Sequence, residues 1–139
     1  LGAPNAIFVE IDADVCESLR NAISSLNLDD RCRILNGDVC ALEDGQFIRD
    51  LVIMNPPWGR QTPRADRPFL DAATKCAKES IHLLHGRGAS HIETWAEKAG
   101  WEAKKWMEVD LPMPAIYSHH TKKMRTTEAA MWWIKRPAR

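Results

Sequence analysis

The chain has 139 residues, of which 45% are hydrophobic and 27% are charged, and its mean hydropathy is −0.38. This composition excludes a disordered chain, and the length predicts one globular domain over residues 1–139. No segment approaches the roughly 20 apolar residues of a membrane-spanning helix. The first residues lack the basic flank and apolar core of a signal peptide. We therefore expect an intracellular protein.

The net charge of zero conceals an asymmetry along the chain. Residues 1–50 contain four Lys and Arg against ten Asp and Glu, whereas residues 51–139 contain fifteen against nine. A basic segment is a candidate surface for a polyanion, and an acidic segment is not. The charge distribution therefore favours a nucleic acid as partner of the C-terminal part.

The first elements in chain order are two predicted strands separated by a helix. Residues 6–12 form a short β-branched run that ends in acidic residues, which is typical of a buried parallel strand. Asp12 is a suitable N-cap for a helix over residues 15–26, where apolar residues repeat at helical spacing. Residues 32–38 predict a second strand that also ends in an acid.

The rest of the chain continues this alternation after a third strand. Residues 69–84 predict a long helix, and residues 92–99 predict another that Gly100 ends. Residues 101–111 and 126–135 predict two strands around a basic loop. Alternating strands and helices imply an α/β fold with a largely parallel sheet. Ligands of such folds bind at the carboxyl ends of the strands.

The most informative motif is Asn55-Pro56-Pro57-Trp58, directly after a predicted apolar strand over residues 51–54. It suits methylation of a planar nitrogen, whose delocalised lone pair is a poor nucleophile. Acceptors opposite the N–H groups localise that lone pair, and the Asn55 side-chain oxygen and Pro56 carbonyl could supply them. The prolines fix the backbone, and Trp58 offers a face on which a flipped base can stack. The alternative is a simple turn with Trp58 as a packing residue.

Two acidic residues end the strands that precede this motif. The Glu10 carboxylate can accept both hydroxyls of a ribose, and Asp38, beside the Val39 N–H, can accept from an adenine amino group. Together they predict a pocket for an adenosyl group, although each acid alone could equally be a solvated cap. The predicted cofactor-binding residues are Glu10, Ile11, Asp38, Val39 and Asn55.

These motifs resemble class I methyltransferases that use S-adenosylmethionine, and more specifically the methyltransferase-like 5 family. That family methylates N6 of adenosine in small-subunit ribosomal RNA. Residues 52–59 are similar to the family's V-I-M-N-P-P-F-G, with Trp58 in place of Phe. Residues 8–14 and 37–40 resemble its acidic second-strand motif and its third motif, and residues 111–123 its L-P-A-S-Y-x-F-H-K-K-K segment.

The resemblance implies a Rossmann-like sheet with helices on both faces, S-adenosylmethionine as cofactor, and location in the cytoplasm or in the nucleus or nucleolus. It implies a catalytic set of Asn55, Pro56, Pro57 and Trp58. A Trm112-like activator subunit that pairs with a strand edge at residues 5–11 or 32–37 is a further implied partner. The family's first strand and glycine-rich D-x-G-x-G loop have no counterpart in these residues, so an inactive domain is an alternative expectation.

Basic residues beside the motif and near the C-terminus are candidate contacts to RNA phosphates, and solvated loop charges are the alternative. They are Arg60, Arg64, Arg67, His119, Lys122 and Lys123. Two other functions stay open. One is a methyltransferase acting on glutamine in release factors, which the basic loop and tail motif disfavour. The other is an inactive domain that binds RNA or a partner protein.

No metal site is predicted from the cysteines or histidines. The four cysteines contain no C-x-x-C pair and lie in apolar segments, as buried free thiols do. His82, His85 and His91 lack the spacing of zinc ligands. The residues leave open a disulfide framework or a zinc knuckle built on Cys16, Cys32, Cys40 and Cys76.

Overall fold

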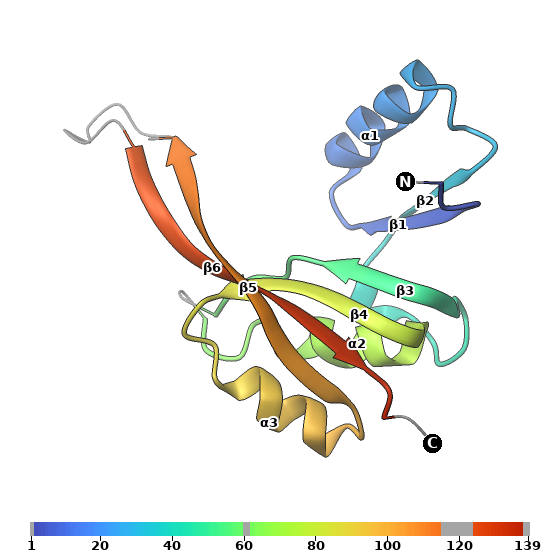
Figure 1. The fold of residues 1–139 in the computed structure, drawn as a ribbon. Coiled ribbons are helices and arrows are strands. Elements are labelled where there is room, and N and C mark those ends of the chain that lie inside the picture. The colour runs from blue at the N-terminus through green and yellow to red at the C-terminus, as the bar shows by residue number, and fades with distance from the viewer. Residues whose placement is uncertain (1, 60–61, 115–123, 138–139) are drawn as a thin grey trace. The chain divides into compact units, whose positions relative to one another are not determined.

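The computed structural model describes residues 2–59, 62–114 and 124–137 (Figure 1). The chain divides into two compact units, Leu1–Glu43 and Asp44–Arg139. None of the helices within the described residues is long and apolar enough to cross a membrane. That the whole chain is a single methyltransferase domain stays a prediction.

The first unit is a parallel strand pair with one helix, as the sequence predicts. Its elements are β1 (Ala6–Glu10), α1 (Ala13–Ser25), β2 (Cys32–Asn36) and the short 3-10 helix η1 (Val39–Ala41).

The ends of these elements are set by local hydrogen bonds. The Asp12 carboxylate accepts from the backbone N–H of Asp14 and Val15, which confirms it as the N-cap of α1. Glu10 lies opposite Asn36 in the parallel register, and the Gly37 N–H donates to the Glu10 carbonyl at 2.9 Å. Both strands therefore end at the same edge of the pair.

The second unit is a mixed four-stranded sheet in the order β3-β4-β6-β5 (Figure 1). Its strands β3 and β4 are parallel, whereas β6 is antiparallel to both β4 and β5. The expected largely parallel sheet is therefore found in β1–β2 and β3–β4 but not in the C-terminal hairpin. The elements are β3 (Arg49–Met54), α2 (Arg67–Cys76), β4 (Ala77–Gly86), α3 (His91–Lys98), β5 (Glu102–Pro114) and β6 (Met124–Lys135).

Both helices of this unit pack on one face of its sheet. Alternate residues of β4, Ile81 and Leu83, are fully buried and belong to one apolar cluster with Trp132 of β6. Leu70 of α2 and Trp95 of α3 close that cluster from the helix side. This core fixes where the carboxyl ends of β3 and β4 lie, and those ends carry the candidate site.

The long helix expected over residues 69–84 is wrong in its second half. The helix α2 ends at Cys76, and the next residues form β4. Burial in β4 alternates, because Ile81, Leu83 and His85 face the core while the residues between them are only partly covered. Because β4 lies between β3 and β6, ladders on both sides outweigh the helical spacing of the sequence.

The later elements agree with the sequence. The helix α3 ends just before Gly100, whose φ of 76° is the left-handed conformation that glycine adopts at low cost. The Gly100 N–H donates to Glu97 and the Trp101 N–H to Ala96, which closes the helix end. The predicted strands over residues 101–111 and 126–135 are confirmed as parts of β5 and β6.

Candidate functional site

The motif Asn55-Pro56-Pro57-Trp58 begins where β3 ends. Prolines lack the N–H that a strand ladder requires, so the two prolines terminate the strand. Pro56 is buried and Asn55 is exposed. The motif thus holds a polar side chain at the strand end on a rigid, partly buried backbone.

Asn55 and Trp58 are joined within the motif. The Trp58 Nε1–H donates to the Asn55 Oδ1 at 2.9 Å. An amide oxygen has two lone pairs, so one of them is engaged by the indole and the other can accept from a ligand. This coupling of the two side chains is not evident from the sequence motif.

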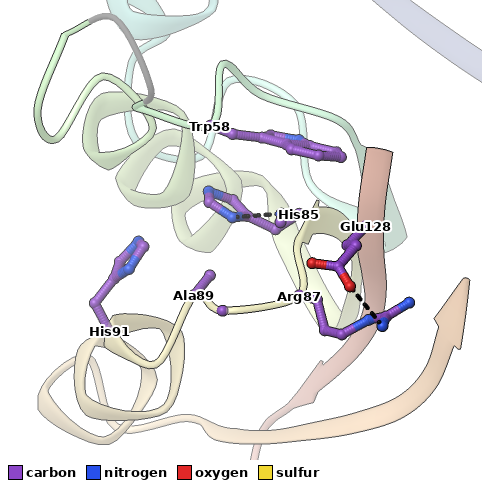
Figure 2. Close-up of a pocket in the computed structure, with 8 residues that line it drawn as sticks. Trp58, His85, Arg87, Ala89, His91 and Glu128 are labelled. Carbon is purple, nitrogen blue, oxygen red and sulfur yellow. Dashed lines mark hydrogen bonds and ion pairs between the residues drawn. The ribbon is translucent and has the colours of Figure 1, made fainter. Parts of the chain in front are cut away.

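A pocket of about 330 Å³ opens beside Trp58. Figure 2 shows the Trp58 ring above His85, with Arg87, Ala89, His91 and Glu128 around the same space. Because β3 and β4 are parallel with Met54 opposite Leu83, the residues after β3 and at the end of β4 meet at this edge. The lining residues are Trp58, His85, Gly86, Arg87, Gly88, Ala89, His91 and Glu128.

Three polar side chains, a combination not predicted from the sequence, meet beside this pocket, and two of them, His85 and His91, also line it. The Asp66 Oδ2 lies 3.1 Å from His85 Nε2 and 2.5 Å from His91 Nε2. Asp66 and His85 are only 3% and 2% exposed. They are therefore a buried polar pair, which is costly unless the groups satisfy each other's hydrogen bonds.

The hydrogen bonds of His85 determine its tautomer. Its Nδ1 accepts from the Gly86 backbone N–H at 2.8 Å, so in the neutral ring the proton is on Nε2 and is donated to Asp66. Burial lowers the pKa of His85 more than the Asp66 carboxylate raises it. His85 is therefore neutral near pH 7, with both ring nitrogens engaged.

The environment of the Asp66 carboxyl favours its ionised form. Burial by itself would raise the pKa of Asp66, but the hydrogen bond from His91 and the charge of His91 outweigh burial and lower the pKa. Asp66 is therefore ionised and accepts from both histidines.

This cluster has the residue types of a zinc site, since its three ligand atoms lie within 4.8 Å of one another. A zinc ion would take the lone pair of His85 Nε2 and require the proton on Nδ1. Nδ1 instead accepts from Gly86. The arrangement seen here is therefore that of hydrogen-bond donors around a carboxylate.

Arg87 and Glu128 also line the pocket. Arg87 forms ion pairs with Glu108, Asp110 and Glu128, the last at 3.1 Å. Three carboxylates thus face one guanidinium, so Arg87 is already engaged and is a poor candidate for binding a phosphate.

Of the five predicted cofactor-binding residues, Asn55 lies in the second unit, and the other four lie in the first. The Glu10 Oε1 accepts from the Asp12 N–H at 2.9 Å, which leaves Oε2 for a ligand. The Asp38 Oδ1 accepts from the Cys40 N–H at 2.8 Å and caps η1, beside Val39. Ile11 is 70% exposed next to Glu10.

The predicted RNA-contacting residues are only partly described. Arg64 is exposed with a φ of 62°, and Arg67 begins α2. The other predicted contacts lie outside the described residues; they are Arg60, His119, Lys122 and Lys123.

Asp66, His85 and His91 were absent from the predicted site because β4 was assigned to a helix. Had residues 77–86 been assigned to a strand parallel to β3, His85 would have been placed beside Asn55. The available signal was the alternation of Ile81, Leu83 and His85 toward a terminal Gly-Arg-Gly.

No family model matches the chain. The chain is 32% identical over 135 residues to an uncharacterised protein of Methanocaldococcus jannaschii, covering 89% of this chain and 60% of that protein. It is 29% identical over 128 residues to the rRNA N(6)-adenosine-methyltransferase METTL5 of Danio rerio, covering 88% of this chain and 60% of METTL5. It therefore spans about 60% of the length of these curated relatives.

Solved structures agree in fold. A structure from Pyrococcus horikoshii, described as a candidate RNA methyltransferase, matches with a TM-score of 0.83 at 24% identity, over 99% of this chain and 66% of that one. Magnesium protoporphyrin IX methyltransferase of Synechocystis, with bound S-adenosylmethionine, matches with a TM-score of 0.66 at 11% identity, over 96% and 60%. These matches confirm the Rossmann-like fold. The chain is therefore similar in sequence to METTL5 and similar in fold to solved methyltransferases.

Proposed function

We propose that the protein transfers a methyl group from S-adenosylmethionine to N6 of an adenosine in RNA, with small-subunit ribosomal RNA as substrate. The observation that carries this proposal is the exposed Asn55 at the end of β3, on a proline-fixed backbone beside the Trp58 pocket. The likeness to METTL5 supports the choice of N6 of adenosine in rRNA.

Asn55 and Pro56 would bind the amino group of the target base. The second lone pair of Asn55 Oδ1 and the Pro56 carbonyl accept the two N–H groups, which localises the nitrogen lone pair toward the methyl carbon. The nitrogen–carbon bond forms as the methyl–sulfur bond breaks, and the amine then loses one proton to water. Trp58 stacks the flipped base, a contact worth roughly 1–3 kcal/mol.

The first unit supplies groups that suit an adenosyl moiety. Glu10 Oε2 is available to accept from ribose hydroxyls, and the exposed Ile11 offers an apolar contact for a purine. Asp38 and the Val39 N–H would recognise the purine edge. S-adenosylmethionine, when bound there, supplies the methyl group.

RNA is favoured over a protein substrate by charge. Arg64 and Arg67 follow the motif and lie in the basic part of the chain, where they would contact phosphates beside the target nucleotide. Arg60, His119, Lys122 and Lys123 are proposed to contribute to the same surface.

We also retain an activator subunit in the proposal. Within the first unit β1 and β2 pair only with each other in the described residues, so each has an edge to which another strand could be added. A Trm112-like protein is the proposed partner, and binding to it would be measured by co-purification.

The test is a methyl-transfer assay with the full gene product, labelled S-adenosylmethionine and deproteinised small-subunit rRNA, with and without a Trm112-like protein. Nucleoside analysis should find the label in N6-methyladenosine. Label in glutamine of a release factor, with none in RNA, would instead identify a protein methyltransferase. No label in either substrate would leave RNA or partner binding without catalysis.

A further inference from the structure

A continuous set of contacts leads from the buried Asp66 to the reactive end of β3. His85 donates to Asp66, and its ring lies 5.9 Å from the Trp58 ring, centroid to centroid, with 23° between the planes. Trp58 donates in turn to Asn55. The proposed base-stacking ring and the proposed amine acceptor are thus both linked through His85 to the Asp66 carboxylate.

The Asp66 side chain binds the two histidines and does not cap its helix. It occupies the N-cap of α2, where an aspartate usually accepts from the first helical N–H groups, yet its side chain makes no capping hydrogen bond. Its carboxylate turns to His85 and His91 instead. The helix α2 therefore lacks the stabilisation of a side-chain cap, and the Asp66 carboxylate orients the His85 ring instead.

Trp58 also packs against the backbone at the end of β4. A Cβ built on Gly86 would lie 3.5 Å from Trp58 Cε3, so the indole packs directly on the backbone at the end of β4. The same Gly86 supplies the N–H that fixes the His85 ring. One backbone position therefore supports both rings.

We propose that Asp66 and His85 are positioning residues that hold the Trp58 ring, and through it Asn55, in the orientation needed for methyl transfer. This proposal rests on the proposed function of the Asn55–Trp58 motif. An exposed asparagine samples several rotamers, and methyl transfer requires an aligned acceptor, because small misplacements cost rate steeply. Fixing Trp58 from below restricts both side chains before the base arrives.

The experiment measures the Trp58 environment separately from catalysis. The full gene product is labelled with 5-fluorotryptophan, and the Trp58 ¹⁹F resonance is identified by its loss in Trp58→Phe. Asp66→Ala should shift and broaden that resonance and lower kcat for rRNA about tenfold, with KM within about threefold. Asp66→Asn, which keeps an acceptor oxygen, should recover most of both.

The matched control is Asp71→Asn, also on α2, where the carboxylate accepts from Trp95 Nε1 at 3.0 Å. This variant should leave the Trp58 resonance and kcat unchanged. If Asp66→Ala does not fold, as the other tryptophan resonances would show, His85→Gln takes its place with the same expectations.

The outcomes separate the two proposals. An unchanged Trp58 resonance in Asp66→Ala, or a shifted resonance with unchanged kcat, would overturn the positioning role. A wild-type protein that methylates no RNA would instead contradict the proposed function. The resonance alone would then decide whether Asp66 holds the ring.

Discussion

Asn55 combines exposure with a hydrogen bond that limits its motion. Its oxygen accepts from Trp58 and retains one lone pair for a ligand. A single side chain would therefore link the proposed stacking surface to the proposed amine-binding position. At the residue scale, two substitutions separate these contributions.

Asn55→Ala should abolish detectable methyl transfer, lowering kcat by at least about 100-fold, because a preorganised acceptor at the reacting nitrogen is removed. S-adenosylmethionine affinity, measured by calorimetry, should stay within about twofold. Turnover equal to that of the wild type would show that Asn55 has no role in the reaction.

Trp58→Ala should lower kcat/KM for RNA about five- to 150-fold, the equivalent of the roughly 1–3 kcal/mol of a lost stacking contact. Trp58→Phe keeps an aromatic face but removes the N–H donor to Asn55, so its loss should be smaller. Steady-state kinetics on the same RNA compares the two. Equal losses in RNA turnover and in cofactor affinity would indicate a folding defect instead.

At the scale of elements, the end of β4 and the start of α2 contribute a buried polar pair beside an apolar core. His85 and Asp66 both have lowered pKa values. The unfolded chain therefore binds protons more readily than the folded chain at each of these groups, and stability falls as the pH is lowered.

We expect the free energy of unfolding to decrease below about pH 6.5, the ordinary pKa of histidine, as the unfolded chain protonates His85 first. A further decrease should follow below about pH 3.8 from Asp66. Urea unfolding at several pH values measures this slope, and His85→Gln should remove its first part. The same slope in that variant would assign the loss to other groups.

The strand assignment of β4 has its own test in the stability of two isoleucine variants. Ile81 is fully buried in β4, whereas Ile53 of the neighbouring β3 is 74% exposed. Ile81→Ala should cost about 2–5 kcal/mol of unfolding free energy because it leaves a cavity. Ile53→Ala should change it by less than about 0.5 kcal/mol. Similar values for both, by urea unfolding, would contradict the one-sided packing of this sheet.

At the scale of the whole molecule, the charge asymmetry follows the two units. Leu1–Glu43 contains three Lys and Arg against eight Asp and Glu, and Asp44–Arg139 contains sixteen against eleven. The basic unit carries the Asn55–Trp58 motif and the acidic unit carries Glu10 and Asp38. Such a division suits an RNA substrate for the basic unit, in keeping with the proposed function.

The two units differ in how much apolar core each contains. Residues 44–139 enclose the cluster around Ile81 and Trp132, whereas residues 1–43 bury Cys16, Ile23 and Leu42. A fragment of residues 44–139 should therefore unfold cooperatively by itself, and a fragment of residues 1–43 should be largely unfolded. Circular dichroism and thermal melts of the two fragments check this. A disordered 44–139 fragment would show that its core is insufficient.

The sequence by itself determined the features that local chemistry controls. The Asp12 cap, the Gly100 helix end and the strand end at Asn55-Pro56-Pro57 depend on neighbouring backbone groups, so residue types and spacing sufficed to predict them. The Asn55–Trp58 motif also indicated the similarity to METTL5 that the comparison found. The roles predicted for Glu10, Asp38 and Asn55 stay predictions.

Only the tertiary structure decided that residues 77–86 form a strand, because the ladders with β3 and β6 come from residues far along the chain. The same long-range pairing brought His85 beneath Trp58, and the packing of α2 brought Asp66 to His85 from 19 residues away. A buried carboxylate between two histidines is stable only where such packing excludes water and supplies partners. Local sequence carries no signal for that condition.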